Sequence, residues 1–216
     1  MLVLGLLLLA GYLAFLLWEK RANDRALRSF RHVIHVSGIR GKTGVCRLLD
    51  AHLRGAGLRV FTKTTGSVPA YIDTEGTEHL LERGGMANIG EQLAMIRRAS
   101  REGAEILILE CMAVQPELQR VSQRDMVRGD VNVITNVRYD HIFEMGESLE
   151  EIADALSAVL PAEGALFTAD ETWFPYFQER CQALGTKAFL CRSGDEGDEN
   201  QAIARAEGAY LGVPAE

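Results

Sequence analysis

The hydrophobic positions of this chain begin with one long uninterrupted run and then change to short alternating blocks. Residues 1–18 are apolar and uncharged, and a helix of that length just crosses a hydrocarbon core of about 30 Å. From residue 32 onward, apolar runs of four or five residues alternate with longer segments whose apolar residues recur every three or four positions. This alternation predicts an α/β domain with a mostly parallel sheet and flanking helices.

The two kinds of segment place the elements along the chain. The apolar runs predict strands at residues 32–36, 58–62, 106–109, 131–135, 165–168 and 187–190. The periodic segments predict helices at residues 43–54, 89–100, 148–159 and 174–184, and a last helix that begins near Asn200. Ser148 and Glu151 have the spacing of a capping box. Residues 66–88 lack helical periodicity, and residues 73–77 are typical of a hairpin turn.

The N-terminal run has two interpretations, a membrane anchor or a cleaved signal peptide. No basic segment precedes it, no small-x-small cleavage site comes after it, and the next residues are Glu19-Lys20-Arg21. These features favour an uncleaved anchor, and basic residues directly after a span favour a cytoplasmic location for the chain on that side. We expect a single-pass cell-membrane protein with a transmembrane anchor at 1–18, a basic juxtamembrane helix at 19–31 and a cytoplasmic α/β domain at 32–216.

Composition and charge narrow the class of protein. A length of 216 residues, with 47% hydrophobic and 25% charged residues, suits one globular domain with a sizeable core. The net charge of −7 argues against nucleic acid as a partner. The cysteines lack the spacing of a metal site, so buried free thiols in a reducing compartment are expected. They are Cys46, Cys111, Cys181 and Cys191.

A glycine-rich loop is the first candidate for chemistry. The sequence Ser37-Gly38-Ile39-Arg40-Gly41-Lys42-Thr43-Gly44 lies between the strand predicted at 32–36 and the helix predicted at 43–54. The amide hydrogens of such a loop and the dipole of the adjoining helix face an anion. Lys42 adds a mobile positive charge for the outer phosphates, and Thr43 adds a hydroxyl for Mg²⁺. The loop therefore predicts ATP binding.

The loop is nevertheless shorter than the common phosphate-binding pattern. That pattern, G-x-x-x-x-G-K-[ST], requires glycine at position 36, where this chain has Val36. The motif alone is thus also compatible with an ordinary strand-to-helix turn. Its position between a strand and an amphipathic helix favours the phosphate-binding interpretation.

Polar residues at the ends of predicted strands are the next candidates, because ligands of an open parallel sheet bind beyond its carboxyl ends. Glu110 ends the most hydrophobic strand, where a carboxylate suits Mg²⁺. A strand-end carboxylate that faces water is the alternative. Thr65 offers a hydroxyl to the metal or belongs to a simple turn. Asp140 and His141 come after a later strand and could hold a second divalent ion.

Together, these motifs resemble the Mur ligase and folylpolyglutamate synthase superfamily, and within it the catalytic subunits of membrane-bound poly-γ-glutamate synthases. The resemblance covers nearly the whole chain. It rests on residues 38–43, 63–66, 88–92, 110–116 and 136–141, and on the apolar N-terminus. It implies the central, Mur-ligase-like ATP-binding domain of that superfamily. The segments Asn88-Ile89-Gly90-Glu91-Gln92 and Glu110-Cys111-Met112-Ala113-Val114 are specific to the poly-γ-glutamate branch.

The resemblance also implies roles for individual residues. The implied ATP-binding set is Gly38, Ile39, Arg40, Gly41, Lys42, Thr43, Gly44 and Asn200, with Asn200 at the adenine. The implied metal ligands are Thr43, Thr65, Glu110 and His141, and the implied catalytic residues are Lys42, Glu110 and His141. The cofactors would be ATP and Mg²⁺, with Mn²⁺ as the alternative ion. The role of residues 88–91 stays open.

The implied reaction is ATP-dependent amide ligation, in which the γ-carboxyl of a glutamate chain is phosphorylated and a glutamate amine then attacks the acyl phosphate. Arg40 and Arg138 are candidate ligands for substrate carboxylates, or solvated surface arginines. The implied partners are glutamate, the growing poly-γ-glutamate chain, the membrane and partner membrane subunits of the synthase and export complex; self-association is left open. The alternatives are another Mur- or folylpolyglutamate-type ligase, and a membrane-anchored ATP-binding subunit that regulates or scaffolds without ligating.

The chain departs from the superfamily pattern in two places. Mur ligases usually carry a carbamylated lysine after the Asp-His segment, and this chain has no lysine between Lys63 and Lys187. Any second metal must therefore be held differently. The superfamily also continues into a C-terminal domain that helps to bind the incoming amino acid, and this sequence stops at Glu216. We expect that domain to be absent here, and this chain alone to bind ATP without forming amides.

Overall fold

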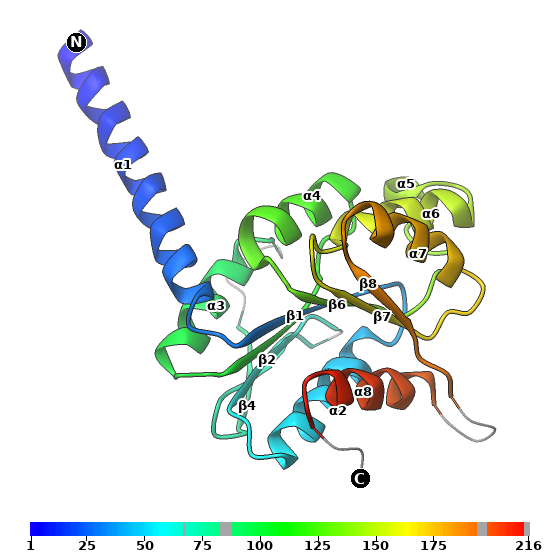
Figure 1. Ribbon diagram of the computed structural model, residues 1–216. Coiled ribbons are helices and arrows are strands. Elements are labelled where there is room, and N and C mark those ends of the chain that lie inside the picture. Colours follow the sequence, from blue (N-terminus) through cyan, green and yellow to red (C-terminus); the bar gives the residue numbers. More distant parts are fainter. Residues whose placement is uncertain (67, 83–87, 194–197, 214–216) are drawn as a thin grey trace.

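The computed structural model describes residues 1–66, 68–82, 88–193 and 198–213, and it consists of one sheet covered by helices on both faces (Figure 1). The strands are β1 (His32–Ser37), β2 (Val60–Thr64), β3 (Ala70–Ile72), β4 (Glu78–Leu80), β5 (Ile106–Glu110), β6 (Val131–Ile134), β7 (Ala165–Thr168) and β8 (Lys187–Leu190). The helices are α1 (Leu2–Leu27), α2 (Lys42–Gly55), α3 (Glu91–Arg101), α4 (Pro116–Val121), α5 (Ile142–Met145), α6 (Leu149–Leu156), α7 (Phe174–Ala183) and α8 (Glu199–Tyr210). A π-helical turn, η1 (Ser122–Val127), continues α4, and a 3₁₀ turn, η2 (Ser157–Val159), continues α6.

The sheet has eight strands in the order β4-β3-β2-β5-β1-β6-β7-β8. The strands from β2 to β8 along this order are parallel, whereas β3 pairs antiparallel with β2 and with β4. The predicted α/β class with a mostly parallel sheet is therefore confirmed. The hairpin expected at residues 73–77 is confirmed as well, because the Asp73 carboxylate accepts hydrogen bonds from the amides of Glu75 and Thr77 and so closes the turn between β3 and β4.

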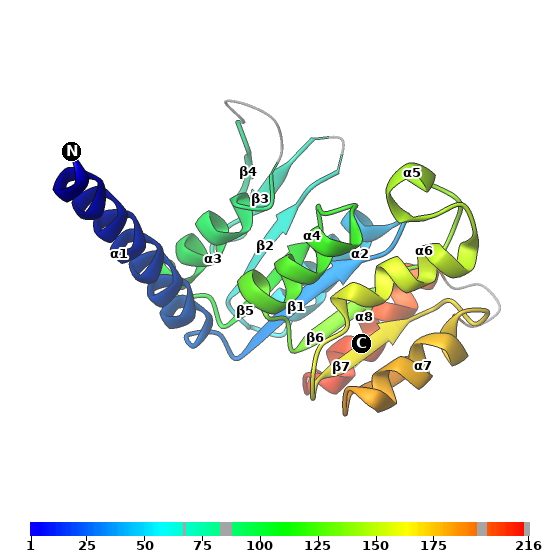
Figure 2. The ribbon, with the colours of Figure 1, turned by 90° about the horizontal axis from the view of Figure 1, so that it is seen from above.

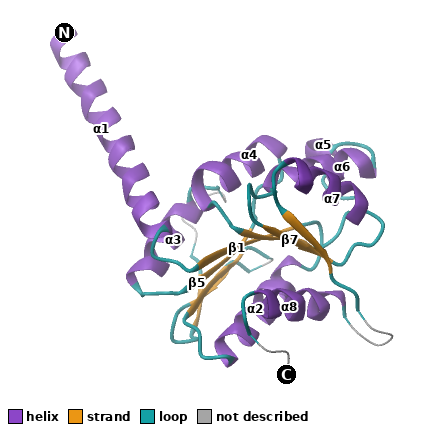
Figure 3. Cartoon of the chain, viewed as in Figure 1, coloured by secondary structure: helices purple, strands orange, loops and turns teal. Residues whose placement is uncertain are grey.

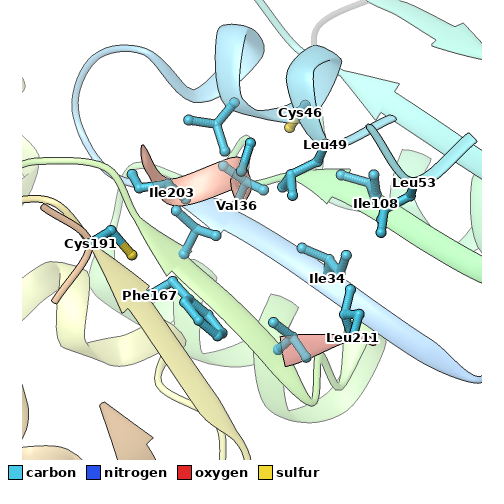
Figure 4. Close-up of a cluster of buried hydrophobic side chains, with 14 of the residues drawn as sticks. Ile34, Val36, Cys46, Leu49, Leu53, Ile108, Phe167, Cys191, Ile203 and Leu211 are labelled. Atoms are coloured by element: carbon cyan, nitrogen blue, oxygen red, sulfur yellow. The ribbon is translucent and has the colours of Figure 1, made fainter. Parts of the chain in front are cut away.

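Helices α2 and α8 cover one face of the sheet, and α3, α4, α6 and α7 cover the other (Figures 1 and 3). The core beneath α2 and α8 is built from side chains of both helices and the central strands, including Val36, Leu49, Ile108 and Ile203 (Figure 4). Each of these four is completely buried. This packing fixes the N-terminal end of α2 directly beyond the carboxyl end of β1.

The central strands define where a ligand can bind. β1 and β5 are neighbours, with Val36 opposite Glu110. The chain leaves β1 towards α2 on one face and leaves β5 towards α4 on the other face (Figures 1 and 2). Connections that diverge in this way open a crevice beyond the carboxyl ends of two adjacent parallel strands. The glycine-rich loop and Glu110 both line this crevice.

Helix α1 is one unbroken helix of 26 residues. Its length and apolar composition are sufficient to cross a membrane, and the apolar stretch is not buried against the rest of the chain. The helix ends at Leu27, so residues 28–31 form a short connection to β1 and are not part of the juxtamembrane helix that the sequence predicts.

Several further elements differ from the sequence prediction. β2 begins at Val60, two residues later than expected, because the amide of Leu58 still donates to the Leu53 carbonyl at the end of α2. α4, η1 and α5 were not predicted. The capping box at α6 is confirmed by reciprocal hydrogen bonds between Ser148 and Glu151. All four cysteines are buried and free, as expected.

A buried histidine gives the fold a predictable pH dependence. His35 on β1 is inaccessible to solvent, and its Nδ1 lies 2.9 Å from the side-chain oxygen of Gln123 in η1. Burial lowers the pKa of His35 from 6.5 to about 4, an effect that the Gln123 hydrogen bond opposes and the charge of Lys63 reinforces. The unfolded chain therefore binds a proton between these pH values and the folded chain does not. The stabilisation is complete above pH 6.5 and is lost as the pH falls towards 4.

We expect about 2 kcal/mol of the free energy of unfolding to be lost through His35 between pH 7 and pH 5. Urea unfolding of the detergent-solubilised chain at both pH values measures it. The His35→Gln variant keeps a polar side chain without a titrating group, so its loss of stability should be smaller by that amount. Buried Glu207, whose pKa burial raises to about 8, acts in the opposite direction in both proteins and cancels in the comparison. Equal pH dependence of both proteins would contradict the prediction.

Candidate nucleotide and metal site

The glycine-rich loop lines a cavity of about 420 Å³ at the crevice between β1 and β5. Every residue from Gly38 to Gly44 contributes to the lining. Gly38 and Gly41 have φ angles of +115° and +85°, which residues other than glycine rarely adopt. These two turns direct the loop around the N-terminal end of α2, where unpaired backbone amides and the helix dipole favour an anion.

The loop packs closely against the carboxyl end of β6, a contact that the sequence did not predict. The amide of Ile39 donates to the Asn136 carbonyl at 3.2 Å, and the amide of Arg40 donates to Asn136 Oδ1 at 3.0 Å. The Arg40 carbonyl in turn accepts from Thr135 Oγ1 at 2.6 Å and from Asn136 Nδ2 at 3.1 Å. Four hydrogen bonds thus hold the first half of the loop against the end of β6.

Gly38→Ala tests this close approach. A Cβ at position 38 would lie 2.1 Å from Thr135 Oγ1 and 2.7 Å from the Thr135 amide nitrogen, and the φ angle is strained for alanine. We expect a loss of stability of at least about 2 kcal/mol together with weaker nucleotide binding. Thermal unfolding and calorimetry with ATP measure the two effects. Gly55→Ala is the control, because a Cβ there meets nothing within 4 Å; equal melting temperatures of the two variants would contradict the prediction.

Lys42 begins α2 and keeps its ammonium inside the loop. Its Nζ donates to the Gly38 carbonyl at 2.7 Å and to the Ile39 carbonyl at 3.2 Å. The side chain is half-buried and lines the cavity. The ammonium is therefore held by two loop carbonyls in the first turn of α2, where it adds a full positive charge to the partial charges of the helix terminus.

Thr43, Thr65 and Glu110 meet at one point of the cavity, although they come from three different elements. Glu110 Oε2 accepts a hydrogen bond from Thr43 Oγ1 at 2.9 Å and another from the Thr65 amide at 2.8 Å. Glu110 is only 3% exposed. Gly66 completes the contact, because a Cβ there would lie 2.8 Å from Thr43 Oγ1. A hydroxyl and a carboxylate converge here, both of which are oxygen ligands that Mg²⁺ accepts.

The segment at residues 88–92, which the sequence left without a role, lies directly behind this point. Gln92 is fully buried, and its Nε2 donates to the backbone carbonyl of Glu110 at 3.1 Å. Glu91 forms an ion pair of 3.4 Å with Lys63, a buried residue of β2 two positions before Thr65. The start of α3 is thereby connected to the ends of both strands that carry the site.

Asp140 and His141 lie at the opposite rim of the same cavity. Asp140 pairs with the Arg40 guanidinium at 2.8 Å. A hydrogen bond from the His141 amide, together with the charges of His141, Arg40 and Lys42, lowers the pKa of the Asp140 carboxyl. His141 is exposed and has a positive φ of 49°. Both residues line the cavity, and Asp140 joins its rim to Arg40 of the loop.

Asn200 lies against the glycine-rich loop from the far end of the chain. Its side-chain oxygen would be 2.9 Å from a Cβ at Gly41, and its side-chain nitrogen would be 3.1 Å from a Cβ at Gly44. Asp198 caps α8 and so holds Asn200 in the first turn of that helix. Asn200 is thus brought to the loop from a distance of more than 150 positions, although it does not line the cavity itself. Arg138, the other arginine considered for substrate, lines a neighbouring cavity.

Within residues 1–66, 68–82, 88–193 and 198–213, no group of three or more His, Cys, Asp or Glu side chains has the geometry of a metal site. The donors that do fit a cation are the Thr43 hydroxyl and the Glu110 carboxylate, beside the glycine-rich loop and the N-terminal end of α2. Such a donor set suits an ion that also takes ligands from a nucleotide.

Burial raises the pKa of Cys111, which lines the cavity, so its thiol stays protonated and is a poor nucleophile.

A family model for the Mur ligase middle domain matches residues 36–209. The chain belongs to this family. The matched range begins within β1 and ends within α8, so it includes the glycine-rich loop, Glu110, His141 and Asn200.

Two curated relatives are CapB proteins, and one of them is named a PGA synthase. The chain is 33% identical over 214 residues to the capsule biosynthesis protein CapB of Bacillus anthracis, a match that covers 93% of this chain and 46% of that protein. It is 33% identical over 183 residues to the PGA synthase CapB of Bacillus subtilis, with 84% and 47% covered. The chain therefore spans less than half the length of these relatives.

A solved structure supports the fold assignment. A bifunctional folylpolyglutamate synthase/dihydrofolate synthase with Mn, AMPPNP and L-glutamate bound superimposes with a TM-score of 0.66 at 17% identity, covering 92% of this chain and 58% of that chain. At this identity the likeness shows a common fold. It is a fold in which one protein binds an ATP analogue and a divalent cation.

Proposed function

We propose that this chain is the ATP-binding part of an ATP-dependent ligase that joins glutamate through its γ-carboxyl in poly-γ-glutamate synthesis. The observation that carries the proposal is the meeting of Thr43 and Glu110 beside the glycine-rich loop in one cavity. The identity to two CapB proteins, one of them named a PGA synthase, supports the substrate class.

The proposed reaction has two steps. A γ-carboxylate oxygen attacks the terminal phosphorus of ATP, and ADP leaves, which gives an acyl phosphate. The amine of a second glutamate then attacks the acyl carbon, the amine loses a proton, and phosphate leaves as the amide forms. Because carboxylate and triphosphate repel each other, the site must neutralise both, and fixed positive groups achieve this without reorganisation.

The residues divide this work between them. The loop amides and the Lys42 ammonium would hold the phosphates, with residues 38–44 forming the cradle. Thr43 and Glu110 would hold a divalent cation, proposed to be Mg²⁺ or Mn²⁺, which supplies charge neutralisation when bound. Thr65 would contribute at the same point, and His141 would face a second ion from the opposite rim. Asn200 would contact the adenine.

We further propose that residues 1–18 of α1 anchor the protein in the cell membrane as a single span, with residues 32–216 on the cytoplasmic side. The support is the exposed apolar helix and the basic residues directly after it. A tag placed after Glu216 should resist protease added to intact cells and become digestible after permeabilisation. Digestion of the tag in intact cells would reverse the proposed topology. Partner membrane subunits of a synthase complex would meet the protein at the membrane.

The test of the ligase is isotope-traced turnover. Membranes that contain the complete protein to which these residues belong should convert ATP to ADP and incorporate labelled glutamate into polymer. The 216-residue chain alone, which spans less than half the length of its curated relatives, should bind ATP and form no polymer. ATP binding without any glutamate incorporation by the complete protein would favour a regulatory subunit instead.

A further inference from the structure

The last turns of α1 are fixed to the body of the protein. Asn23 is 3% exposed and donates from Nδ2 to the Met126 carbonyl of η1 at 2.8 Å. Asp24 pairs with Arg128 at 2.8 Å, and Ala26 belongs to a core cluster with Ile96 of α3 and Met126. These contacts leave no flexible linker between the apolar helix and the sheet, so the direction of α1 sets the direction of the body.

The rigid connection places one face of the body at the level where the apolar helix ends. The uncharged stretch of α1 stops at Trp18. The next residue, Glu19, lies 3.5 Å from Arg97 of α3. The pKa of the Asp125 carboxyl in η1 is lowered mainly by Arg124, then by Arg128, and least by Lys20, so Lys20 of α1 lies near η1. α3 and η1 therefore flank the base of the span (Figures 1 and 2).

The elements that meet at the base of the span carry a group of basic side chains that we call the basic collar. Its members lie on α1, on α3, on η1 or directly after η1: Lys20, Arg21, Arg25, Arg97, Arg101, Arg124 and Arg128. Three acidic residues lie among these seven cations, namely Glu19, Asp24 and Asp125. The side chain of Arg124 is 71% exposed, that of Arg128 41% and that of Arg97 31%.

The collar contrasts with the charge of the whole molecule. Residues 1–31 carry five basic and two acidic residues, whereas residues 32–216 carry a net charge of −10. An anionic bilayer surface repels a body with this overall negative charge. The collar differs from the rest of the body because its cations outnumber the anions among them. The surface of such a bilayer attracts basic groups only within about 10 Å.

We propose that the basic collar binds the headgroups of anionic phospholipids and thereby holds the body in one orientation against the membrane. The proposal rests on the proposed membrane anchoring by α1. The occupant is a bilayer because the collar surrounds the base of the span, at the level where the polar headgroups of the same membrane must lie. The arginines provide planar donors that suit phosphate oxygens. The crevice beyond β1 and β5 then keeps a fixed position relative to the membrane.

Lipid binding by the full chain tests the collar. The wild-type chain in neutral detergent should bind phosphatidylglycerol in preference to phosphatidylcholine when measured by native mass spectrometry. The double variant Arg97→Gln/Arg124→Gln should lose about fivefold in phosphatidylglycerol affinity for each arginine. The control is Arg192→Gln/Arg205→Gln, which removes the same charge from two exposed arginines away from the collar. It should keep the wild-type preference.

The outcomes separate the collar from the anchor. If alkaline carbonate extracts the wild-type chain from membranes, the anchoring fails and the collar fails with it. If the chain stays in the membrane but binds both lipids equally, or if both double variants lose affinity to the same extent, the collar is overturned while the anchor stands. Matching melting temperatures of the two variants show that any difference does not arise from unfolding.

Discussion

Lys42→Ala is expected to weaken ATP binding by roughly tenfold or more. A charge-assisted hydrogen bond contributes about 1.5–3 kcal/mol, and removing the ammonium forfeits at least one such contact to the outer phosphates. Among the described residues that line the cavity, Lys42 is the one lysine. Its ammonium is held within the loop, at 2.7 Å from the Gly38 carbonyl oxygen. Calorimetric titration of the detergent-solubilised chain with Mg-ATP measures the change.

The same substitution also removes two hydrogen bonds within the loop, so stability must be measured beside affinity. Lys187→Ala is the matched control, because Lys187 is exposed at the start of β8 on the outer edge of the sheet. The control should bind ATP as the wild type does. Unchanged ATP affinity of Lys42→Ala, in a chain that melts at the wild-type temperature, would show that the glycine-rich turn is an ordinary connection between β1 and α2.

The parts of the fold that the sequence predicted are those decided by local patterning. β5 is a continuous apolar run because both faces of a central parallel strand are covered by helices. α6 begins at Leu149, directly after Ser148, because Ser148 and Glu151 each accept a hydrogen bond from the other's backbone amide. Such signals lie within a few residues of the element that they specify.

The elements that the sequence missed depend on contacts with distant residues. α4 and η1 lack a clear hydrophobic period, because buried polar side chains alternate with exposed apolar ones: Gln119 and Gln123 are buried, whereas Leu118 and Val121 are partly exposed. Gln123 is buried there because it bonds to His35, 88 positions earlier. No pattern within η1 contains that information.

The candidate site shows the same division. Lys42, Thr43 and Glu110 were identified because a loop and a strand end are local features, and the structure places them around one cavity. The supporting contacts were not identified. Asn136 reaches the loop across 96 positions, and Gln92 bonds the Glu110 backbone from another helix. Asn200 was assigned from family resemblance alone. It can lie against Gly41 and Gly44 only because glycine has no Cβ, which would come within 2.9 Å and 3.1 Å of the Asn200 side chain.

Glu110→Gln is expected to keep the fold and to abolish ATP turnover by the complete protein. The substitution preserves the size of the side chain and one oxygen, so the bonds from Thr43 and from the Thr65 amide can persist. It removes the negative charge that a divalent cation requires of a carboxylate ligand. Affinity for ATP in the presence of Mg²⁺ should therefore fall, by roughly tenfold if the carboxylate contacts the ion directly.

The sign of the effect without metal separates a metal ligand from a structural carboxylate. With Mg²⁺ chelated, the wild-type carboxylate repels the triphosphate, so Glu110→Gln should bind ATP as tightly as the wild type or more tightly. Glu117→Gln, the same change at an exposed position of α4, should leave both affinities unchanged. If Glu110→Gln instead loses affinity equally with and without Mg²⁺ and melts at a much lower temperature, Glu110 supports the ends of β2 and α2 through its hydrogen bonds and does not hold a metal.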